Sequence, residues 1–386
     1  MPLVSGARRC ARRRGARRAR ARAARPHLDA ALRGAVRRAA PPRADRGVNG
    51  GVRGERADER PDAGAAGLVS VVLASRNGAR YLPAALASLA AQTLGEFEVL
   101  LVDDGSTDAT PRLLAAFAAA RPRARVLRAG GVGPAAARDL AARAAAGAYL
   151  AIHDDDDVSA PERLARQRAY LDAHPGTALV GSAADVLDAD GRVTGAYPVP
   201  LGARAIARAL RRAPAFVHGS VMMRRDAYRA AGGYRAPFAV AEDYDLYLRL
   251  AAHGALENLP ERLYAWRAHP GNTHARRRDE HVFFCALART LAWERARRGT
   301  DSLAAFAAAP SREAFVAGHP LGARLALAWG EGLVREGRVA EARAVLGRAL
   351  ADARLAPAAA AWWALSVPVG WSPRARRARA AAGARG

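Results

Sequence analysis

The fold of this chain is decided by the stretch Val69-Ser-Val-Val-Leu-Ala74, an apolar run that ends in the polar turn Ser75-Arg-Asn-Gly78. A second run, Phe97-Glu-Val-Leu-Leu-Val102, ends in the same way at Asp103-Asp-Gly-Ser-Thr-Asp108. Short runs rich in β-branched and aliphatic residues, bounded by turn residues, are typical of buried strands. We therefore predict two buried strands with a polar loop at the carboxyl end of each.

Helices and further strands are predicted to alternate with these two runs. The predicted segments are a helix with Leu82, Leu86, Leu89 and Thr93 on one face, a helix with Pro111 in its first turn, a strand at Arg125-Val-Leu127, a helix over 134–146 and a strand at Tyr149-Leu-Ala-Ile152. This alternation favours a largely parallel sheet covered by helices. Ligands of such sheets bind at the carboxyl ends of the strands, where the acidic motifs of this chain lie.

The second half of the chain has a mixed pattern that becomes helical. The predicted segments are strands at 178–180, 185–187 and 216–223, a helix over 242–252, and a helical region beyond residue 279 with a hairpin over 325–355 broken at 336–338. The segment 356–370 is predicted to pack as a terminal helix or to lie on a membrane surface. The predicted fold class is therefore α/β, with a mixed, mainly parallel central sheet followed by a helical C-terminal region.

The positive charge of the chain is concentrated at its two ends. All 61 basic residues are arginine, and the formal net charge is +25 over 386 residues. Residues 1–66 hold 18 arginines and six acidic residues, and residues 372–386 hold five arginines and no acid. We expect a disordered leader, because residues 1–66 are poor in large apolar side chains, and a basic tail. Contact of these ends with nucleic acid or anionic lipid is the alternative.

Cysteine content and hydropathy bear on the compartment. The two cysteines, Cys10 and Cys285, cannot support a disulfide framework. No run of about 18 apolar residues predicts a membrane span, and Arg8-Arg9 is not followed by the apolar stretch of an export signal. We predict a cytoplasmic protein, or one peripheral at the inner face of the membrane.

The most acidic motif is His153-Asp-Asp-Asp-Asp157, directly after the predicted strand that ends at Ile152. Four adjacent carboxylates repel one another unless a cation or solvent relieves the charge. Mg²⁺ or Mn²⁺ between one or two carboxylates and a substrate diphosphate would do so; a solvated acidic loop is the alternative, and the spacing of an EF-hand is absent. The pair Asp103-Asp104 can accept hydrogen bonds from a nucleobase or a ribose, the alternative being a capped turn.

Four motifs occur together in one order along the chain. They read Ser70-Val-Val-Leu-Ala-Ser-Arg-Asn-Gly78, Val102-Asp-Asp-Gly-Ser-Thr-Asp108, Asp154-Asp-Asp-Asp157 and Ala241-Glu-Asp-Tyr-Asp245. The ordered set resembles the family 2 glycosyltransferases of GT-A fold and spans just over half of the chain. The resemblance implies metal-assisted transfer of a sugar, with inversion, from a nucleotide-diphosphate donor to an acceptor hydroxyl.

The resemblance also implies roles for individual residues. The implied nucleotide-sugar site consists of Ala74, Arg76, Asn77, Asp103, Asp104, Arg138, Asp154 and Asp155. The implied metal ligands are Asp156 and His269, and the implied catalytic base is Asp243. Candidate contacts on the acceptor side are His218, Tyr234, Glu242 and Trp266. The catalytic domain would cover residues 67–275, and the helical region residues 276–371.

Several of these residues also have purely structural alternatives. Asp243 can cap a helix. His218 and His269 can be buried and hydrogen-bonded, and Tyr234 and Trp266 can belong to the core. Two positions depart from the family pattern. Arg76 replaces the aromatic residue that often precedes this asparagine, and Asp139 stands where an asparagine commonly follows the arginine. The first departure bears on base stacking and the second adds negative charge near the proposed anion site.

Three other functions fit the sequence less well than sugar transfer. The stretch Gly131-Val-Gly-Pro-Ala-Ala136 imitates a dinucleotide fingerprint, but that fingerprint belongs in the first strand-to-helix turn. A nucleotidyltransferase would need an early basic, glycine-rich loop for a triphosphate, and this sequence lacks such a loop. A non-catalytic nucleic-acid-binding protein would use the arginine-rich ends. We predict a nucleotide-sugar donor, a saccharide or lipid-linked acceptor of polysaccharide or glycolipid synthesis, and no specific nucleic acid.

Overall fold

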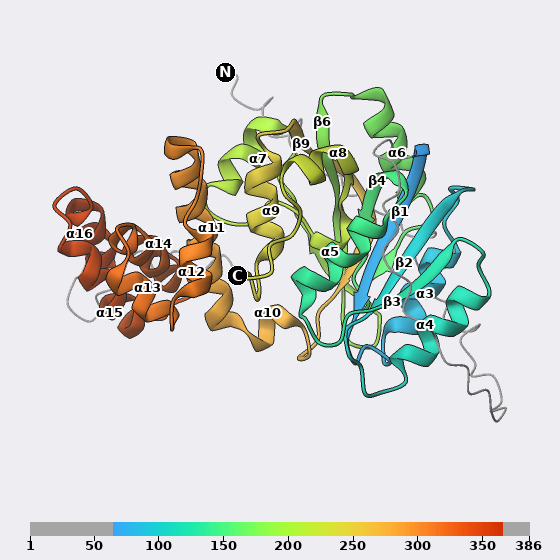
Figure 1. Cartoon of the computed structure of the whole chain (residues 1–386), viewed down its shortest axis with the longest axis horizontal. Helices are drawn as coiled ribbons and strands as arrows, with labels where there is room; N and C mark the ends of the chain where they lie inside the picture. Colours follow the sequence, from blue (N-terminus) through green and yellow to red (C-terminus); the bar gives the residue numbers. More distant parts are fainter. Residues whose placement is uncertain (1–64, 366–386) are drawn as a thin grey trace, which may run out of the picture. The chain divides into compact units, whose positions relative to one another are not determined.

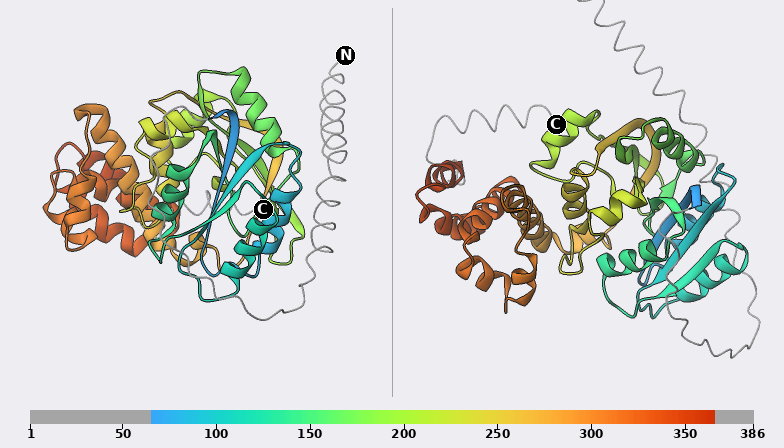
Figure 2. Two further views of the ribbon diagram at one scale, coloured as in Figure 1. Left: turned by 45° about the vertical axis from the view of Figure 1, so that its right-hand side comes forward. Right: turned by 45° about the horizontal axis from the view of Figure 1, so that its top comes forward.

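The computed structural model describes residues 65–365, so residues 1–64 of the predicted leader and the basic tail lie outside the described range, whereas residues 65 and 66 begin a strand. The described chain divides into two compact units (Figures 1 and 2). The first comprises residues 65–206, 215–230 and 254–269. The second comprises residues 207–214, 231–253 and 270–365. The predicted domain boundary at residue 275 stays a prediction.

The first unit is built on one mixed sheet. Its strands are β1 (Ala65–Ser75), β2 (Phe97–Asp103), β3 (Ala124–Arg128), β4 (Gly147–Ile152), β5 (Val158–Ser159), β6 (Thr177–Leu187), β7 (Val193–Tyr197), β8 (Met222–Arg224) and β9 (Ala255–Arg267). The order is β3-β2-β1-β4-β8-β6-β9-β5, with β7 paired to β6. The parallel pairings β1–β2, β1–β4, β2–β3 and β6–β9 hold most of the paired residues. The predicted mixed, mainly parallel sheet is confirmed.

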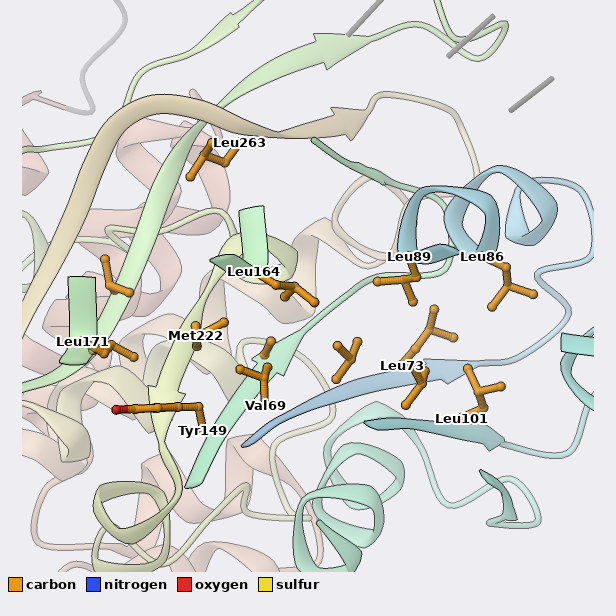
Figure 3. Close-up of a cluster of buried hydrophobic side chains, with 14 of the residues drawn as sticks. Val69, Leu73, Leu86, Leu89, Leu101, Tyr149, Leu164, Leu171, Met222 and Leu263 are labelled. Atoms are coloured by element: carbon orange, nitrogen blue, oxygen red, sulfur yellow. The ribbon is translucent and has the colours of Figure 1, made fainter. Parts of the chain in front are cut away.

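Helices cover both faces of the parallel half of the sheet. They are α3 (Leu82–Ala90), α4 (Thr110–Ala119), α5 (Pro134–Ala144) and α6 (Arg163–Ala173); the short helices η1 (His218–Ser220), α7 (Ala203–Leu210) and α8 (Arg225–Ala230) follow later in the chain. Leu86 and Leu89 of α3 lie over Leu73 and Leu101 of the sheet (Figure 3). Full burial of each such side chain contributes about 1.5–3 kcal/mol relative to exposure. The apolar runs predicted as strands therefore form the centre of this core.

Three predicted strands have a different form in the structure. The predicted strands 178–180 and 185–187 are one strand, β6, because it pairs with β9 along its whole length through small residues that separate the two apolar runs. The predicted strand 216–223 is instead η1 followed by β8. A Cβ at Gly219 would lie 1.9 Å from the hydroxyl of Tyr264, so the tight turn at this point requires glycine.

The second unit is helical in the described range. Its helices are α9 (Glu242–Leu250), α10 (Thr273–Arg276), α11 (Arg278–Arg298), α12 (Leu303–Ala308), α13 (Arg312–Gly318), α14 (Gly322–Arg335), α15 (Val339–Leu350) and α16 (Ala356–Leu365). Leu333, Leu346 and Val282 form a buried cluster. The predicted hairpin with a break at 336–338 is confirmed, and Gly337, with φ 76°, adopts the left-handed conformation there. Within residues 65–365, none of the helices is long and apolar enough to cross a membrane.

Candidate active site

The polar loops after β1 and β2 are tied together by side chains. Asn77, with φ 56°, is one of two non-glycine residues with positive φ in the described chain. Its backbone N–H donates to Ser106 Oγ at 3.0 Å, and its side-chain oxygen accepts the N–H of Thr107 at 2.8 Å. The N–H of Ala79 donates to Asp108 Oδ2 at 3.1 Å. The two predicted loops thus form one framework at the carboxyl ends of neighbouring parallel strands.

Asp103 and Asp104, the first two aspartates of the loop after β2, are buried and hydrogen-bonded. Asp104 accepts the N–H groups of Gly131, Val132 and Gly133 at 2.8, 2.7 and 2.9 Å. Asp103 accepts the N–H of Ser106 at 3.0 Å. Asp104 therefore holds the glycine-rich loop before α5, and contact of Asp104 with a nucleoside, which stays a prediction, would have to compete with these three amides.

The four consecutive aspartates at the end of β4 have four different partners. The partners are Arg138 Nη2 for Asp154 at 2.8 Å, Ser75 Oγ for Asp155, His269 Nε2 for Asp156 at 2.9 Å and the N–H of Arg267 for Asp157 at 2.7 Å. These partners come from β1, α5 and the end of β9. The acidic loop is therefore a packed junction of the first unit, in which each carboxylate points to a separate neighbour.

Negative charge is only partly compensated at this junction. Burial alone would raise the pKa of Asp154, but Arg138 and His218 hold that pKa below its ordinary value. Burial and the charge of Asp156 raise the pKa of Asp155 to about 7. Burial and the charge of Asp154 raise the pKa of Asp156 to about 6. A cation bound beside Asp155 and Asp156 would stabilise their ionised forms.

His269 joins the junction two residues beyond the end of β9. Burial, together with the charges of Arg267 and Arg80, lowers the pKa of the imidazole. It is therefore mostly neutral at neutral pH, the form in which an imidazole nitrogen binds a metal. Its ring packs against Tyr81, with the two ring centroids 4.5 Å apart. The sequence indicated His269 but gave no sign of Tyr81.

Arg163 is hydrogen-bonded to the end of β4, directly before the acidic loop, and was not predicted from the sequence. Its guanidinium is fully buried and donates to the carbonyls of Ile152 at 2.6 Å and Val221 at 3.3 Å, and to Ser159 Oγ at 2.9 Å. It also lies 5.1 Å from the ring centroid of Tyr264. Burial lowers the pKa of Arg163 to about 10, so it keeps its charge at neutral pH. It links the end of β4 to the start of β8.

The remaining predicted residues of the first unit lie around this junction. Ala74 pairs with Val102 in the β1–β2 register, and Arg76 is exposed. His218 is half-buried, as is Trp266, whose ring lies edge-on to Tyr197 with centroids 6.2 Å apart. Within the described residues, no group of three or more histidine, cysteine, aspartate or glutamate side chains is already arranged to hold a metal ion.

The departure at Asp139 has a structural explanation. This side chain accepts the hydroxyl of Tyr228 at 2.7 Å and forms an ion pair with Arg143 at 2.5 Å. Its charge is therefore compensated locally, one residue away from Arg138 and its ion pair with Asp154.

The second acidic motif belongs to the second unit, at the start of α9. Ala241, with φ 58°, precedes the helix. Glu242 and Asp245 are buried, at 7% and 0% exposed, whereas Asp243 is half-buried and accepts the N–H of Tyr244 at 2.7 Å. Tyr234, in the same unit, is 4% exposed. Among these acids of α9, Asp243 has the carboxylate most open to a ligand.

Known glycosyltransferases are similar to this chain in sequence. The family model for glycosyl transferase family 2 matches residues 70–232. The putative glycosyltransferase EpsE of Bacillus subtilis is 35% identical over 52% of this chain and 72% of its own length. The amylovoran biosynthesis glycosyltransferase AmsE of Erwinia amylovora is 30% identical over 54% of this chain and 79% of its own length.

A solved structure is also similar. The mannosyltransferase PcManGT from Pyrobaculum calidifontis, solved with GDP-Man and Mn²⁺, is 21% identical with a TM-score of 0.48, over 79% of this chain and 81% of that chain. The family match and the two relatives define the class of the protein as a sugar-transferring enzyme. Given its similarity to EpsE and AmsE, this chain belongs to glycosyl transferase family 2 and is a glycosyltransferase.

Proposed function

We propose that this glycosyltransferase moves a sugar from a nucleotide-diphosphate donor to an acceptor hydroxyl with inversion, assisted by a divalent metal. The observation that carries the proposal is the convergence of Arg138, the acidic loop and His269 at the carboxyl end of β4. A cation and an anionic diphosphate are complementary to this mixture of carboxylate, imidazole and guanidinium groups. The relative AmsE, whose name refers to amylovoran biosynthesis, supports a role in polysaccharide or glycolipid synthesis.

The residues at Asp156 and His269 fit Mg²⁺ or Mn²⁺. A carboxylate oxygen and a neutral imidazole nitrogen lie 2.9 Å apart there, with side chains 22% and 11% exposed. Such ions are usually held by one or two protein carboxylates together with substrate phosphates. The ion, when bound, would offset the charge that develops on the leaving diphosphate.

The donor would be held by residues of the first unit. Arg138, whose guanidinium forms an ion pair with Asp154, would also contact a phosphate oxygen of the donor. Asn77 and Asp104 fix the loops against which the nucleoside would lie. Ala74, Arg76 and Asp103 would complete that surface. Asp155, through its hydrogen bond with Ser75, joins the surface to the acidic loop. We propose the nucleoside beside the β1 and β2 loops and the diphosphate beside Arg138.

Asp243 is the proposed base. The acceptor oxygen forms a bond to the anomeric carbon as the bond from that carbon to the diphosphate breaks, and the hydroxyl proton passes to the Asp243 carboxylate. The partial exposure of Asp243 supports this role over its neighbours Glu242 and Asp245, which are buried. On the acceptor side we propose the half-buried His218 and Trp266 together with the buried Tyr234 and Glu242.

Location and domain limits are proposed on the sequence alone. We propose a catalytic domain over residues 67–275 and a helical region over residues 276–371, in a cytoplasmic protein or one peripheral at the inner face of the membrane. The acceptor would be a saccharide or a lipid-linked sugar.

Calorimetric titration of the full chain with UDP, GDP and dTDP, with and without Mn²⁺, tests the proposal. We expect one nucleotide to bind in a metal-dependent manner and the substitution Asp156→Ala to remove that dependence. Absence of nucleotide binding by a folded protein would contradict the proposed donor. Equal binding with and without Mn²⁺ would contradict the proposed metal.

A further inference from the structure

Tyr81, the residue before α3, has contacts that the proposed mechanism does not use. Its ring centroid lies 4.5 Å from that of His269, with the two planes inclined by 46°. The guanidinium carbons of Arg267 and Arg80 lie 4.9 and 5.0 Å from the Tyr81 centroid. Aromatic pairs and cation–π contacts at these distances are favourable. The ring of Tyr81 thus contacts three groups that surround the proposed metal site.

The backbone holds Tyr81 firmly in this place. Its N–H donates to the carbonyl of Gly78 at 3.0 Å, and its carbonyl accepts the N–H of Ala84 at 3.0 Å as α3 begins. Its hydroxyl is buried and has no hydrogen-bond partner within residues 65–365. The contacts with His269, Arg267 and Arg80 are therefore made by the ring, and phenylalanine could make all of them.

His269 lies beyond the end of β9, where no strand pairing fixes its side chain. Its Nε2 must nevertheless face Asp156, as it does at 2.9 Å. Residues that contact a metal-binding histidine commonly set its orientation and so its affinity for the metal. The ring of Tyr81 packs directly on this imidazole.

We propose that Tyr81 is a positioning residue whose ring holds the His269 imidazole in the orientation that places Nε2 at Asp156. The inference rests on the proposed metal site at Asp156 and His269. Without the ring, the imidazole would lose a packing contact that restrains its side-chain bonds, and metal binding would have to order it at a greater entropic cost.

Titration of the full chain with Mn²⁺ alone tests this inference. We expect Tyr81→Leu to weaken Mn²⁺ binding about tenfold, the low end of the range for residues behind a metal ligand. Tyr81→Phe should bind within about twofold of wild type, because the hydroxyl has no partner. Tyr170→Leu is the matched control, since Tyr170 stacks on His174 with centroids 4.1 Å apart and should leave Mn²⁺ binding unchanged.

A double-mutant cycle with His269→Ala separates positioning from general damage to the structure. In the His269→Ala background, Tyr81→Leu should have no further effect on Mn²⁺ binding. A tenfold loss in that background, a loss in Tyr81→Phe equal to that in Tyr81→Leu, or wild-type binding by Tyr81→Leu would each overturn the inference. Should Tyr81→Leu not fold, Tyr81→Met is read by the same criteria. Wild-type Mn²⁺ binding that does not depend on Asp156 would instead overturn the proposed metal site itself.

Discussion

The acidic loop Asp154–Asp157 and the acidic start of α9 have similar compositions but neutralise their charge differently. In the loop, Asp154 forms an ion pair with Arg138, and the pKa values of the next three carboxyls are raised. In α9, the fully buried Asp245 accepts from the guanidinium groups of Arg235 and Arg249 at 2.8 Å. The loop therefore keeps negative charge that a bound cation would stabilise, whereas arginines already neutralise the charge of Asp245 in α9.

This difference assigns separate tasks to the two acidic regions. Carboxylates with raised pKa values are suited to a metal and a diphosphate, and a helix start fixed by a buried ion-pair network is suited to holding one half-buried carboxylate in place. In this interpretation, Asp245 and its arginines secure α9 so that Asp243 can act on a substrate. The predictions below test that division from the largest expected effect to the smallest.

The first prediction concerns Asp243→Asn. We expect turnover to fall by about 10³-fold, within the range for loss of a general base, while nucleotide binding changes less than about twofold. Initial rates of sugar transfer and calorimetric nucleotide binding check the two expectations. Asp226→Asn is the matched control, because Asp226 lies in the first turn of α8 and accepts the N–H of the next residue at 2.7 Å, as Asp243 does.

An equal loss of nucleotide binding in Asp243→Asn would show that this carboxylate belongs to the donor site. It would also remove the functional difference between the two acidic regions. Asp226→Asn should keep wild-type turnover.

The second prediction concerns Asp245→Ala. Removing the carboxylate leaves the charges of Arg235 and Arg249 buried without it, so we expect the free energy of unfolding to fall by about 3 kcal/mol. Urea denaturation followed by circular dichroism measures the change. The control is Asp190→Ala, which removes an exposed ion pair with Arg192 and should cost less than about 1 kcal/mol. Similar losses in the two variants would contradict the assignment of Asp245 as the buried anchor of α9.

Much of the fold could be predicted because its signals are local. The runs that form β1 and β2, and the break between α14 and α15, are visible within a few neighbouring residues. The predicted strand 216–223 was wrong in part, because the turn at Gly219 depends on Tyr264, which follows 45 positions later. Contacts of that kind leave no mark on the sequence around either residue.

The carboxylates of the site could be predicted from their own pattern, whereas Arg138 and His269 were predicted only through the family resemblance. Four consecutive aspartates are unusual in any chain, whereas the groups that neutralise or pack against them are not. Arg163 and Arg267 are two of 61 arginines, and no local pattern distinguishes the buried ones from the exposed ones. Ser75 lies 80 positions from its partner Asp155. The chemistry was therefore visible in the sequence, but the arrangement that tunes it was not.

The third prediction is a pH dependence that should belong to the acidic loop. The pKa of Asp155 is about 7 in the folded protein and 3.8 in a model peptide, so between about pH 4 and 7 the folded state holds a proton that the unfolded state releases. The stability that this proton provides is lost progressively as the pH rises from about 4 to about 7. The side chain of Asp155→Asn does not ionise, so in metal-free buffer we expect the advantage of the variant over wild type to be small at pH 5 and to reach its full size at pH 8.

The expected gain of Asp155→Asn at pH 8 is on the order of 2 kcal/mol, allowing for partial exposure of the side chain. Thermal denaturation in EDTA at the two pH values measures it. Asp190→Asn, in an exposed pair, should show the same small difference from wild type at both pH values. A constant difference for Asp155→Asn as well would show that the loop carries no excess charge and so resembles α9 after all.

The smallest effect is expected from Gly78→Ala, which tests whether Asp155 is held in place or free to move. A Cβ at Gly78 would lie 2.1 Å from Asp155 Oδ2 and 2.5 Å from Ser75 Oγ, so the carboxylate must shift and lose its hydrogen bond. We expect a loss of about 1–2 kcal/mol, against less than about 0.5 kcal/mol for Gly95→Ala, where the added Cβ meets nothing within 4 Å. In an Asp155→Ala background the nearer obstacle is gone while Ser75 Oγ remains, so Gly78→Ala should then cost less than it does in wild type. If the full loss persists in that background, the β1 loop is rigid for another reason, and Asp155 does not tie it to the acidic loop.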